Sequence, residues 1–209
     1  MLMPERKDMN TFVIIALIIV VITAGISWYY SYRAEKDTEK LVDVLVQGRF
    51  EEFDRLASDA DQTGKIPGFN LDLMKLNSYI MRNDDNNIRN SFDHFKQVHL
   101  NAAQKEEIGT KGFIYYLGKN DRENTGFFLE MLKNSNTSET VKQTSQMYYD
   151  IIYSGKTDYL QKLLDEVKVL PDSEKVADEK LIAIIYRNMK RDDLAEEYEK
   201  LSEKHSKKG

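Results

Sequence analysis

Apolar residues recur at spacings of three and four along most of the chain after residue 33. Leu160, Leu163 and Val167 show this spacing clearly, and similar groups occur earlier and later. The spacing places apolar side chains on one face of a helix. A half-buried strand would need alternating apolar and polar residues, and the sequence contains no sustained alternation. The pattern therefore predicts an all-α fold.

One stretch departs from this pattern because it is apolar on every face. Residues 11–30 contain no charged side chain, and a helix of that length spans about 30 Å, the thickness of the hydrocarbon core of a bilayer. Aromatic residues of the kind that gathers at membrane interfaces lie at its C-terminal edge: Trp28, Tyr29, Tyr30 and Tyr32. We expect a tail at 1–10 and a single transmembrane helix at 11–30.

Two alternatives compete with a retained membrane anchor. A core helix of a globular domain is rarely apolar all round. A cleaved signal peptide has a shorter apolar region that ends in small residues, whereas this run ends in bulky aromatic residues. Basic residues are nearly balanced on the two sides of the span. The short tail favours a signal-anchor arrangement in the cell membrane, with the following domain extracytoplasmic.

The polar breaks between the predicted helices recur at nearly constant distances. Turn markers separated by 35, 35, 37 and 34 residues lie at Gly48, Asn83, Gly118, Gly155 and Met189. Equivalent apolar residues flank each marker, and in the third unit Phe127 and Met131 hold these equivalent places in the second helix. A helical hairpin buries its apolar faces by stacking on the next one. The spacing predicts about five stacked hairpins over 31–204, before a disordered tail at 205–209.

The period is close to that of tetratricopeptide (TPR) repeats. Segments 153–159 and 186–193 resemble the hinge of that repeat, where an aromatic residue ends the first helix and polar residues begin the second. The signature Trp and Leu-Gly of the first helix are missing, and only Pro171 lies near a unit boundary. The chain therefore resembles a degenerate TPR-like helical-repeat protein. An irregular helical bundle with a coincidental period is the alternative.

Composition and motifs argue against several kinds of partner, metal site and catalysis. The formal net charge of −5 argues against nucleic acid as a partner, and the absence of cysteine removes disulfides and thiolate metal sites. His94 and His99 are five residues apart, which does not place both on one helix face. We expect no catalytic residues, no cofactor and no metal, and therefore no enzyme. Carboxylates at comparable places before the second helices are expected to act as N-caps: Asp84, Asp121, Asp158 and Asp192.

Aromatic residues gather at the ends of the predicted first helices. In a solenoid these helices usually line the concave surface, and Tyr is favoured at protein interfaces. The candidates for partner binding are Tyr115, Tyr116, Tyr148, Tyr149 and Tyr186. For each of them the alternative is packing between repeats.

The order of one N-terminal span and a TPR-like domain is similar to that of YfgM-type ancillary translocon subunits. This resemblance of layout implies contact with membrane or secreted proteins and a scaffold or chaperone-like role. We therefore expect a membrane-anchored protein–protein interaction module. Two alternatives stay open: a regulatory subunit that senses a ligand or peptide, and a self-assembling, homo-oligomeric structural subunit of a cell-envelope complex.

Overall fold

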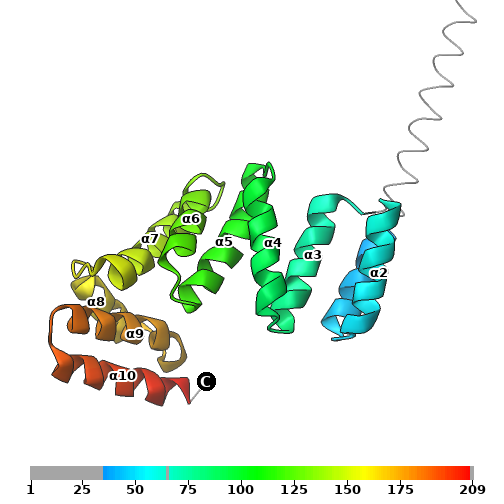
Figure 1. The fold of residues 1–209 in the computed structure, drawn as a ribbon. Helices are drawn as coiled ribbons and strands as arrows, with labels where there is room; N and C mark the ends of the chain where they lie inside the picture. The colour runs from blue at the N-terminus through cyan, green and yellow to red at the C-terminus, as the bar shows by residue number, and fades with distance from the viewer. Residues whose placement is uncertain (1–34, 65, 208–209) are drawn as a thin grey trace, which may run out of the picture. The chain divides into compact units, whose positions relative to one another are not determined.

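The computed structural model describes residues 35–64 and 66–207. Every regular element in these ranges is a helix, which confirms the all-α prediction there. A helix over residues 35–46 is followed by α2 (Phe50–Thr63), α3 (Gly68–Met81), α4 (Asp85–Gln97), α5 (Ala102–Gly118), α6 (Arg122–Lys133), α7 (Glu139–Ser154), α8 (Leu160–Val169), α9 (Asp172–Asn188) and α10 (Asp192–Ser206) (Figure 1).

The predicted membrane span at 11–30, its aromatic residues and the tail at 1–10 lie outside the described residues. Within the described ranges, no helix combines the length and the apolar character needed to cross a bilayer. The transmembrane helix therefore stays a prediction.

The helices form two compact units, with the boundary between His94 and Phe95, inside α4. In the first unit, the helix over 35–46 shares an apolar core with α2 and α3. Buried members of this core are Leu41, Val44, Phe53, Ala57, Ile66 and Leu71. The spacing of three between Leu41 and Val44, and of four between Phe53 and Ala57, is the one that an amphipathic helix requires.

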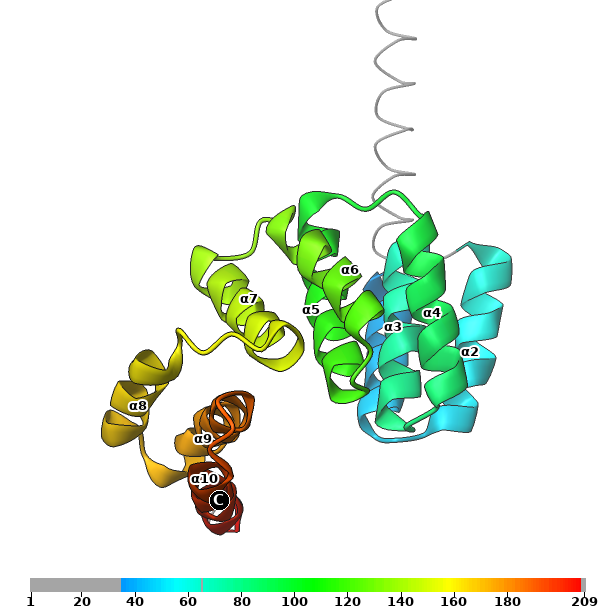
Figure 2. The ribbon, with the colours of Figure 1, turned by 60° about the vertical axis from the view of Figure 1, so that its left-hand side comes forward.

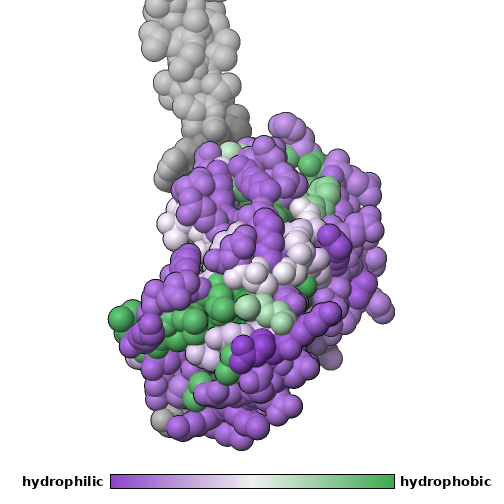
Figure 3. All heavy atoms as spheres, turned by 90° about the vertical axis from the view of Figure 1, so that its left-hand side faces the viewer, coloured by the Kyte–Doolittle hydropathy of each residue, from purple (hydrophilic) through white to green (hydrophobic). Residues whose placement is uncertain are grey.

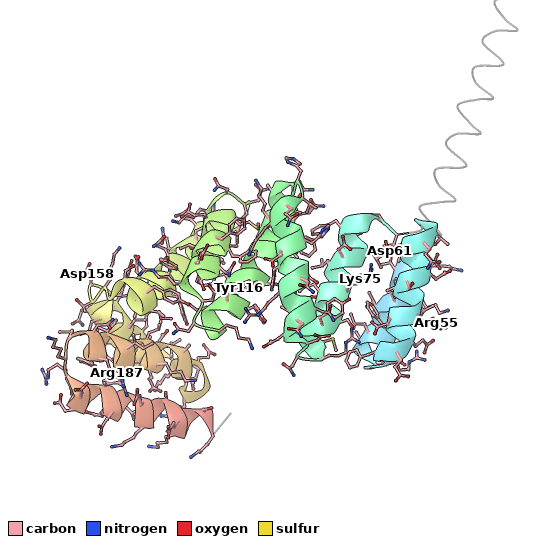
Figure 4. All side chains as sticks on the ribbon, in the orientation of Figure 1. Arg55, Asp61, Lys75, Tyr116, Asp158 and Arg187 are labelled. Carbon is pink, nitrogen blue, oxygen red and sulfur yellow. The ribbon has the colours of Figure 1, made fainter. Side chains whose placement is uncertain are left out.

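Ion pairs reinforce the contact between the α2 and α3 segments. Lys75 Nζ lies 2.8 Å from Asp61 Oδ2, and Figure 4 shows the two side chains near each other. Arg82 donates to both carboxylate oxygens of Asp54, at 2.8 and 3.2 Å, while its guanidinium lies over the ring of Phe50. A bidentate contact of this kind fixes the orientation of the two side chains and also pairs their opposite charges. The charges along this contact are thus paired within the first unit.

In the second unit, α5 and α6 approach closely because α5 carries glycines where they meet. A Cβ built on Gly112 would lie 2.5 Å from the ring of Phe128, and one built on Gly109 would lie 3.1 Å from Leu132. Phe128 and Leu132 are both almost fully buried. The absence of a side chain at the two glycines therefore leaves the space that these α6 residues fill.

The remaining helices of the second unit share another core. α9 packs against α10, and both α7 and α8 contact α9 (Figure 2). The buried residues are Met147, Ile151, Leu163, Leu181, Ile182 and Ile185. The three-and-four spacing of apolar residues at 160–167 thus belongs to a helix, as predicted.

The turns inside successive hairpins each contain a residue with positive φ, and four of the five share one pattern of hydrogen bonds. Residues with positive φ recur at spacings of 35, 37, 35 and 35: Gly48, Asn83, Asn120, Gly155 and Lys190. At all of these except Gly155, the N–H of the positive-φ residue bonds the carbonyl three residues earlier, and the next N–H bonds the carbonyl five residues before it. This pair of bonds closes the Schellman motif at a helix C-terminus. The near-constant turn spacing is confirmed, whereas TPR-like stacking remains a prediction.

At two of the turns the positive-φ residue lies one or two positions after the marker taken from the sequence. α5 stays helical through Gly118, and the positive-φ residue is Asn120; the last marker moves from Met189 to Lys190. Glycine is the usual residue at such a position, so the sequence pattern points to Gly118. Asparagine also tolerates the left-handed conformation, and here it is the residue that turns the chain.

The shift of the third turn changes which residues of α6 reach the core. Phe127, predicted to be a core position, is 43% exposed, and Met131 is only half-buried. Counted from Asn120, the equivalent positions are Leu129 and Leu132, which are 2% and 1% exposed. The core prediction for Phe127 and Met131 is therefore wrong, and the buried positions lie two residues and one residue later.

The prediction of a disordered tail at 205–209 is wrong for its first two residues. α10 continues through Ser206, and His205 is 8% exposed. Its Nδ1 lies 2.9 and 3.0 Å from the two carboxylate oxygens of Glu179, which is itself buried. The Lys-rich sequence predicts fraying, but this contact between α10 and α9 fastens the end of the helix.

The predicted N-caps are confirmed in two places. Asp84 and Asp121 each accept a hydrogen bond from the backbone N–H three residues later, at 3.2 and 3.1 Å. Asp158 and Asp192 do not cap, because α8 and α10 begin without a side-chain cap. Asp192 lies within the first turn of α10, where its charge still favours the positive end of the helix.

Candidate binding surfaces

Tyr116, one of the five tyrosines predicted to bind a partner, is 2% exposed. Its ring stacks on that of Phe128, with centroids 5.6 Å apart. Figure 4 shows Tyr116 among the helices of the second unit. Tyr116 therefore packs in the core, as the packing alternative expects.

Tyr149 packs between neighbouring hairpins. A Cβ built on Gly126 of α6 would lie 3.2 Å from the Tyr149 hydroxyl. One turn further along α7, the Tyr153 hydroxyl lies 3.3 Å from Thr125 Oγ1, within hydrogen-bonding distance. Gly126 costs about 1 kcal/mol of helix preference relative to Ala. The close approach of Tyr149 explains why a helix interior accommodates a glycine there.

Tyr115, Tyr148 and Tyr186 are half-buried, so part of each ring stays accessible. Burial raises the pKa of Tyr148, and the negative charge of Asp178 raises it further. The Tyr186 ring lies 5.7 Å from the ring of Tyr198, between α9 and α10. Each of these tyrosines combines packing with some exposed surface, and their role in partner binding stays a prediction.

A groove that the sequence did not predict lies beside α6. We call it the α4–α6 groove, and its volume is about 540 Å³. It is lined by Phe95, Lys96, Val98, His99, Leu100, Lys105, Phe127, Glu130, Met131 and Asn134. Val98 is 38% exposed and Phe127 is 43% exposed, so the apolar part of the lining meets solvent. Basic and acidic side chains border this apolar part.

Lys96 fixes one wall of the α4–α6 groove. Its Nζ donates a hydrogen bond to Asn124 Oδ1 at 2.5 Å and lies 5.6 Å from the ring centroids of both Tyr116 and Phe127. A cation over aromatic faces is attracted to them. The Phe127 ring also makes an edge contact with Phe128, at 5.3 Å between centroids. The groove thus presents an aromatic side chain held in place before any partner arrives.

Phe127 and Met131 are the sequence signal that would reveal this groove. In the predicted register, both residues count as core positions. With the turn at Asn120, the same two residues become an apolar i, i+4 pair on the outer side of α6. An apolar pair that faces out of a helix is a mark of contact with another element or molecule.

A buried carboxylate organises the turn between α7 and α8. Asp150 is 5% exposed and accepts hydrogen bonds from Gln146 Nε2 at 2.9 Å, Lys156 Nζ at 2.8 Å and the Tyr159 hydroxyl at 2.9 Å. Burial alone would raise the pKa of Asp150, but these hydrogen bonds outweigh it and hold the pKa below its ordinary value. The carboxylate is ionised and fully engaged, so it anchors the turn and is unsuited to donating a proton.

His205 and Glu179 form a second buried polar contact, between α10 and α9. The second ring nitrogen of His205, Nε2, lies 3.6 Å from Asp172 Oδ1, so both sides of the imidazole face carboxylates. Within the described residues, no three His, Cys, Asp or Glu side chains are arranged to hold a metal ion. His205 of α10 thus contacts α9 at two places, at Glu179 within the helix and at Asp172 at its start.

Comparison of the chain with protein-family models, with curated proteins and with solved structures gives no match in any of the three. Among the surfaces described above, the α4–α6 groove combines exposed apolar residues, a fixed aromatic ring and a hollow surface.

Proposed function

We propose that the protein is a membrane-anchored protein–protein interaction module that binds a segment of another protein in the α4–α6 groove. The observation that carries the proposal is the exposed Phe127 beside the half-buried Met131 in a groove of about 540 Å³. Apolar side chains left at the surface of such a hollow gain free energy when a partner covers them. Lys96 holds the Phe127 ring in place, which lowers the ordering cost of binding.

The recurring hairpin turn supports a TPR-like architecture for this module. In repeat proteins each hairpin buries its apolar face against the next one, and the extended surface serves for binding. The packing of Tyr149 against Gly126 joins one hairpin to the next in the way that such stacking requires. The proposed domain is a degenerate TPR-like solenoid of about five hairpins.

The apolar segment 11–30 supports the location that we propose. A single-pass anchor there would confine the binding surface to the membrane face and raise its effective concentration for other membrane or secreted proteins. With an extracytoplasmic domain, the protein would act as a scaffold or chaperone-like subunit near the secretion or envelope machinery. Protease added to intact cells should then remove the domain, and protection of the domain would reverse this orientation.

One surface observation favours self-assembly as a second candidate. Val169, at the end of α8, is 83% exposed, and Figure 3 shows a band of apolar side chains among hydrophilic ones on one face of the molecule. Exposed apolar bands of this kind also mark contacts between copies of a chain. A structural subunit that self-associates would bury such a band.

Site-specific photo-crosslinking in native membranes tests the proposal. A photoreactive residue at Phe127 should crosslink to another protein, whereas one at Ile114, which is 64% exposed and outside the groove lining, should not. Recovery of only the protein itself from both positions would favour self-assembly. Equal crosslinking of the same partner proteins from both positions would show that the α4–α6 groove is not the binding site.

A further inference from the structure

A second groove in the second unit has a different chemistry. Its lining residues come from the end of α6, from α7, and from the residues around the start of α8, and its volume is about 600 Å³. We call it the lysine groove, because Lys133, Lys142 and Lys162 line it. Met147, which is 5% exposed, supplies an apolar part of the lining.

The charge of the lysine groove is opposite to that of the whole chain. The chain carries a net charge of −5, yet the groove lining contains three lysines and a single carboxylate, Glu139. Glu139 accepts a hydrogen bond from Gln143 at 3.3 Å. Within the described part of the chain, no ion pair engages the side chain of Lys142.

The other two lysines have only surface partners. Lys133 lies 2.6 Å from Glu130, and Lys162 lies 3.8 Å from Glu166, each within one turn of its own helix. Exposed pairs of this kind are weak and exchange readily with another carboxylate. All three ammonium groups can therefore interact with an anionic ligand.

The Asp150 network fixes part of the lining of the lysine groove. Gln146 and Tyr159 both line the groove, and both donate hydrogen bonds to the buried carboxylate of Asp150. These bonds leave little freedom to the two side chains. The amide oxygen of Gln146 and the Tyr159 oxygen, which donates its proton to Asp150, can both accept from the N–H groups of an incoming chain.

We propose that the lysine groove binds an acidic peptide segment of a partner protein. Asp or Glu side chains of the segment would pair with the three lysines, and its backbone would meet Gln146 and Tyr159. The proposal rests on the proposed role as a protein-interaction module and adds the chemistry of the partner. Nucleic acid is a poorer occupant, because its binding requires a longer track of cations than a chain with a net charge of −5 offers here.

Fluorescence anisotropy of the full-length protein in detergent micelles tests this inference. The probe is a labelled short peptide of Glu-Ser-Gly repeats, and its Gln-Ser-Gly counterpart serves as the neutral control. Replacement of Lys133, Lys142 and Lys162 by Gln should weaken binding of the acidic peptide by about tenfold. The same replacement at three exposed lysines elsewhere in the second unit should change binding less than about twofold. These control positions are Lys180, Lys200 and Lys204.

Three results would overturn the inference. The neutral peptide could bind as well as the acidic one, the control variant could lose as much affinity as the groove variant, or a single-stranded DNA of equal length could bind more tightly. Circular dichroism of both variants checks that the helices are retained, which is expected because the substituted lysines lie at the surface.

The two proposals fail in distinguishable ways. Specific crosslinks from Phe127 without binding of the acidic peptide would retain the α4–α6 groove as a binding site and reject the lysine groove. Binding of the acidic peptide that depends on the three lysines, without specific crosslinks from Phe127, would do the reverse.

Discussion

Gly112 and Gly118 allow one substitution to be compared at two places in a single helix. In Gly112→Ala, the new methyl group would lie 2.5, 2.5 and 2.7 Å from three ring atoms of Phe128. In Gly118→Ala, it would meet no heavy atom within 4 Å. Both changes add the helix preference of Ala over Gly, about 1 kcal/mol in a helix interior and less at the last residue.

At Gly112 the gain in helix preference opposes the cost of overpacking against Phe128. Phe128 is 0% exposed and stacks on Tyr116, so its ring has little room to move aside. Overpacking of a core costs about 1–3 kcal/mol, which exceeds the gain in helix preference. We expect Gly112→Ala to lower the free energy of unfolding by about 1–2 kcal/mol and Gly118→Ala to raise it by up to about 0.5 kcal/mol.

Urea and thermal denaturation of the full-length protein in detergent micelles, monitored by far-UV circular dichroism, measure the free energy of unfolding and the Tm of both variants. The difference of about 2 kcal/mol between the variants corresponds to about 4–8 °C in Tm for a domain of this size. Equal shifts in the two variants, or stabilisation by Gly112→Ala, would refute the close approach of α5 and α6. Because the ring of Phe127 contacts that of Phe128, Gly112→Ala should also weaken crosslinking from the α4–α6 groove.

Three further predictions concern the turns between helices. Asp121→Ala should cost about 1 kcal/mol in the free energy of unfolding because it removes an N-cap, whereas Asp158→Ala, at a helix without a side-chain cap, should cost less than about 0.5 kcal/mol. Lys190→Gly should stabilise the protein by up to about 1 kcal/mol because it relieves a positive φ of 59°, whereas Lys200→Gly inside α10 should destabilise it by a similar amount; thermal denaturation distinguishes them. The lowered pKa of Asp150 predicts stability that is present above the unfolded-state pKa, about 3.9, and is lost as the pH falls through and below that value. Denaturation of Asp150→Asn across that range should show a smaller dependence on pH than the wild type; an equal dependence would contradict the assignment.

Local patterns in the sequence were sufficient to predict the helices and most of the turns. Gly48, Asn83 and Gly155 are turn residues in both the sequence pattern and the structure, because their residue types favour positive φ. Lys190 has no such preference, so its positive φ follows from the closing hydrogen bonds of the turn and is not encoded in the residue itself.

The surfaces were harder to predict than the helices, because they depend on register and on contacts between distant residues. Counting from Gly118 in place of Asn120 selected Phe127 and Met131 as core positions where Leu129 and Leu132 are buried, which hid the α4–α6 groove. Side chains that meet across helices leave no local pattern in the sequence. The contact of His205 with Glu179, 26 residues earlier, is one example.

The fourth hairpin shows where the repeated turn gives way to a different local structure. Three residues separate the helices in the α3–α4, α5–α6 and α9–α10 hairpins, whereas five separate α7 from α8. At this longer turn the N–H of Lys156 bonds the carbonyl of Asp150, six residues earlier, in place of the Schellman pair. The additional residues bring Lys156 and Tyr159 onto the Asp150 carboxylate, and Tyr159 in turn lines the lysine groove. A departure from a locally consistent pattern is expected where a chain serves a function besides folding. The unusual turn between α7 and α8 lies at the lysine groove. This is a reason to test the lysine groove as a binding site that does not depend on the charge of its lining.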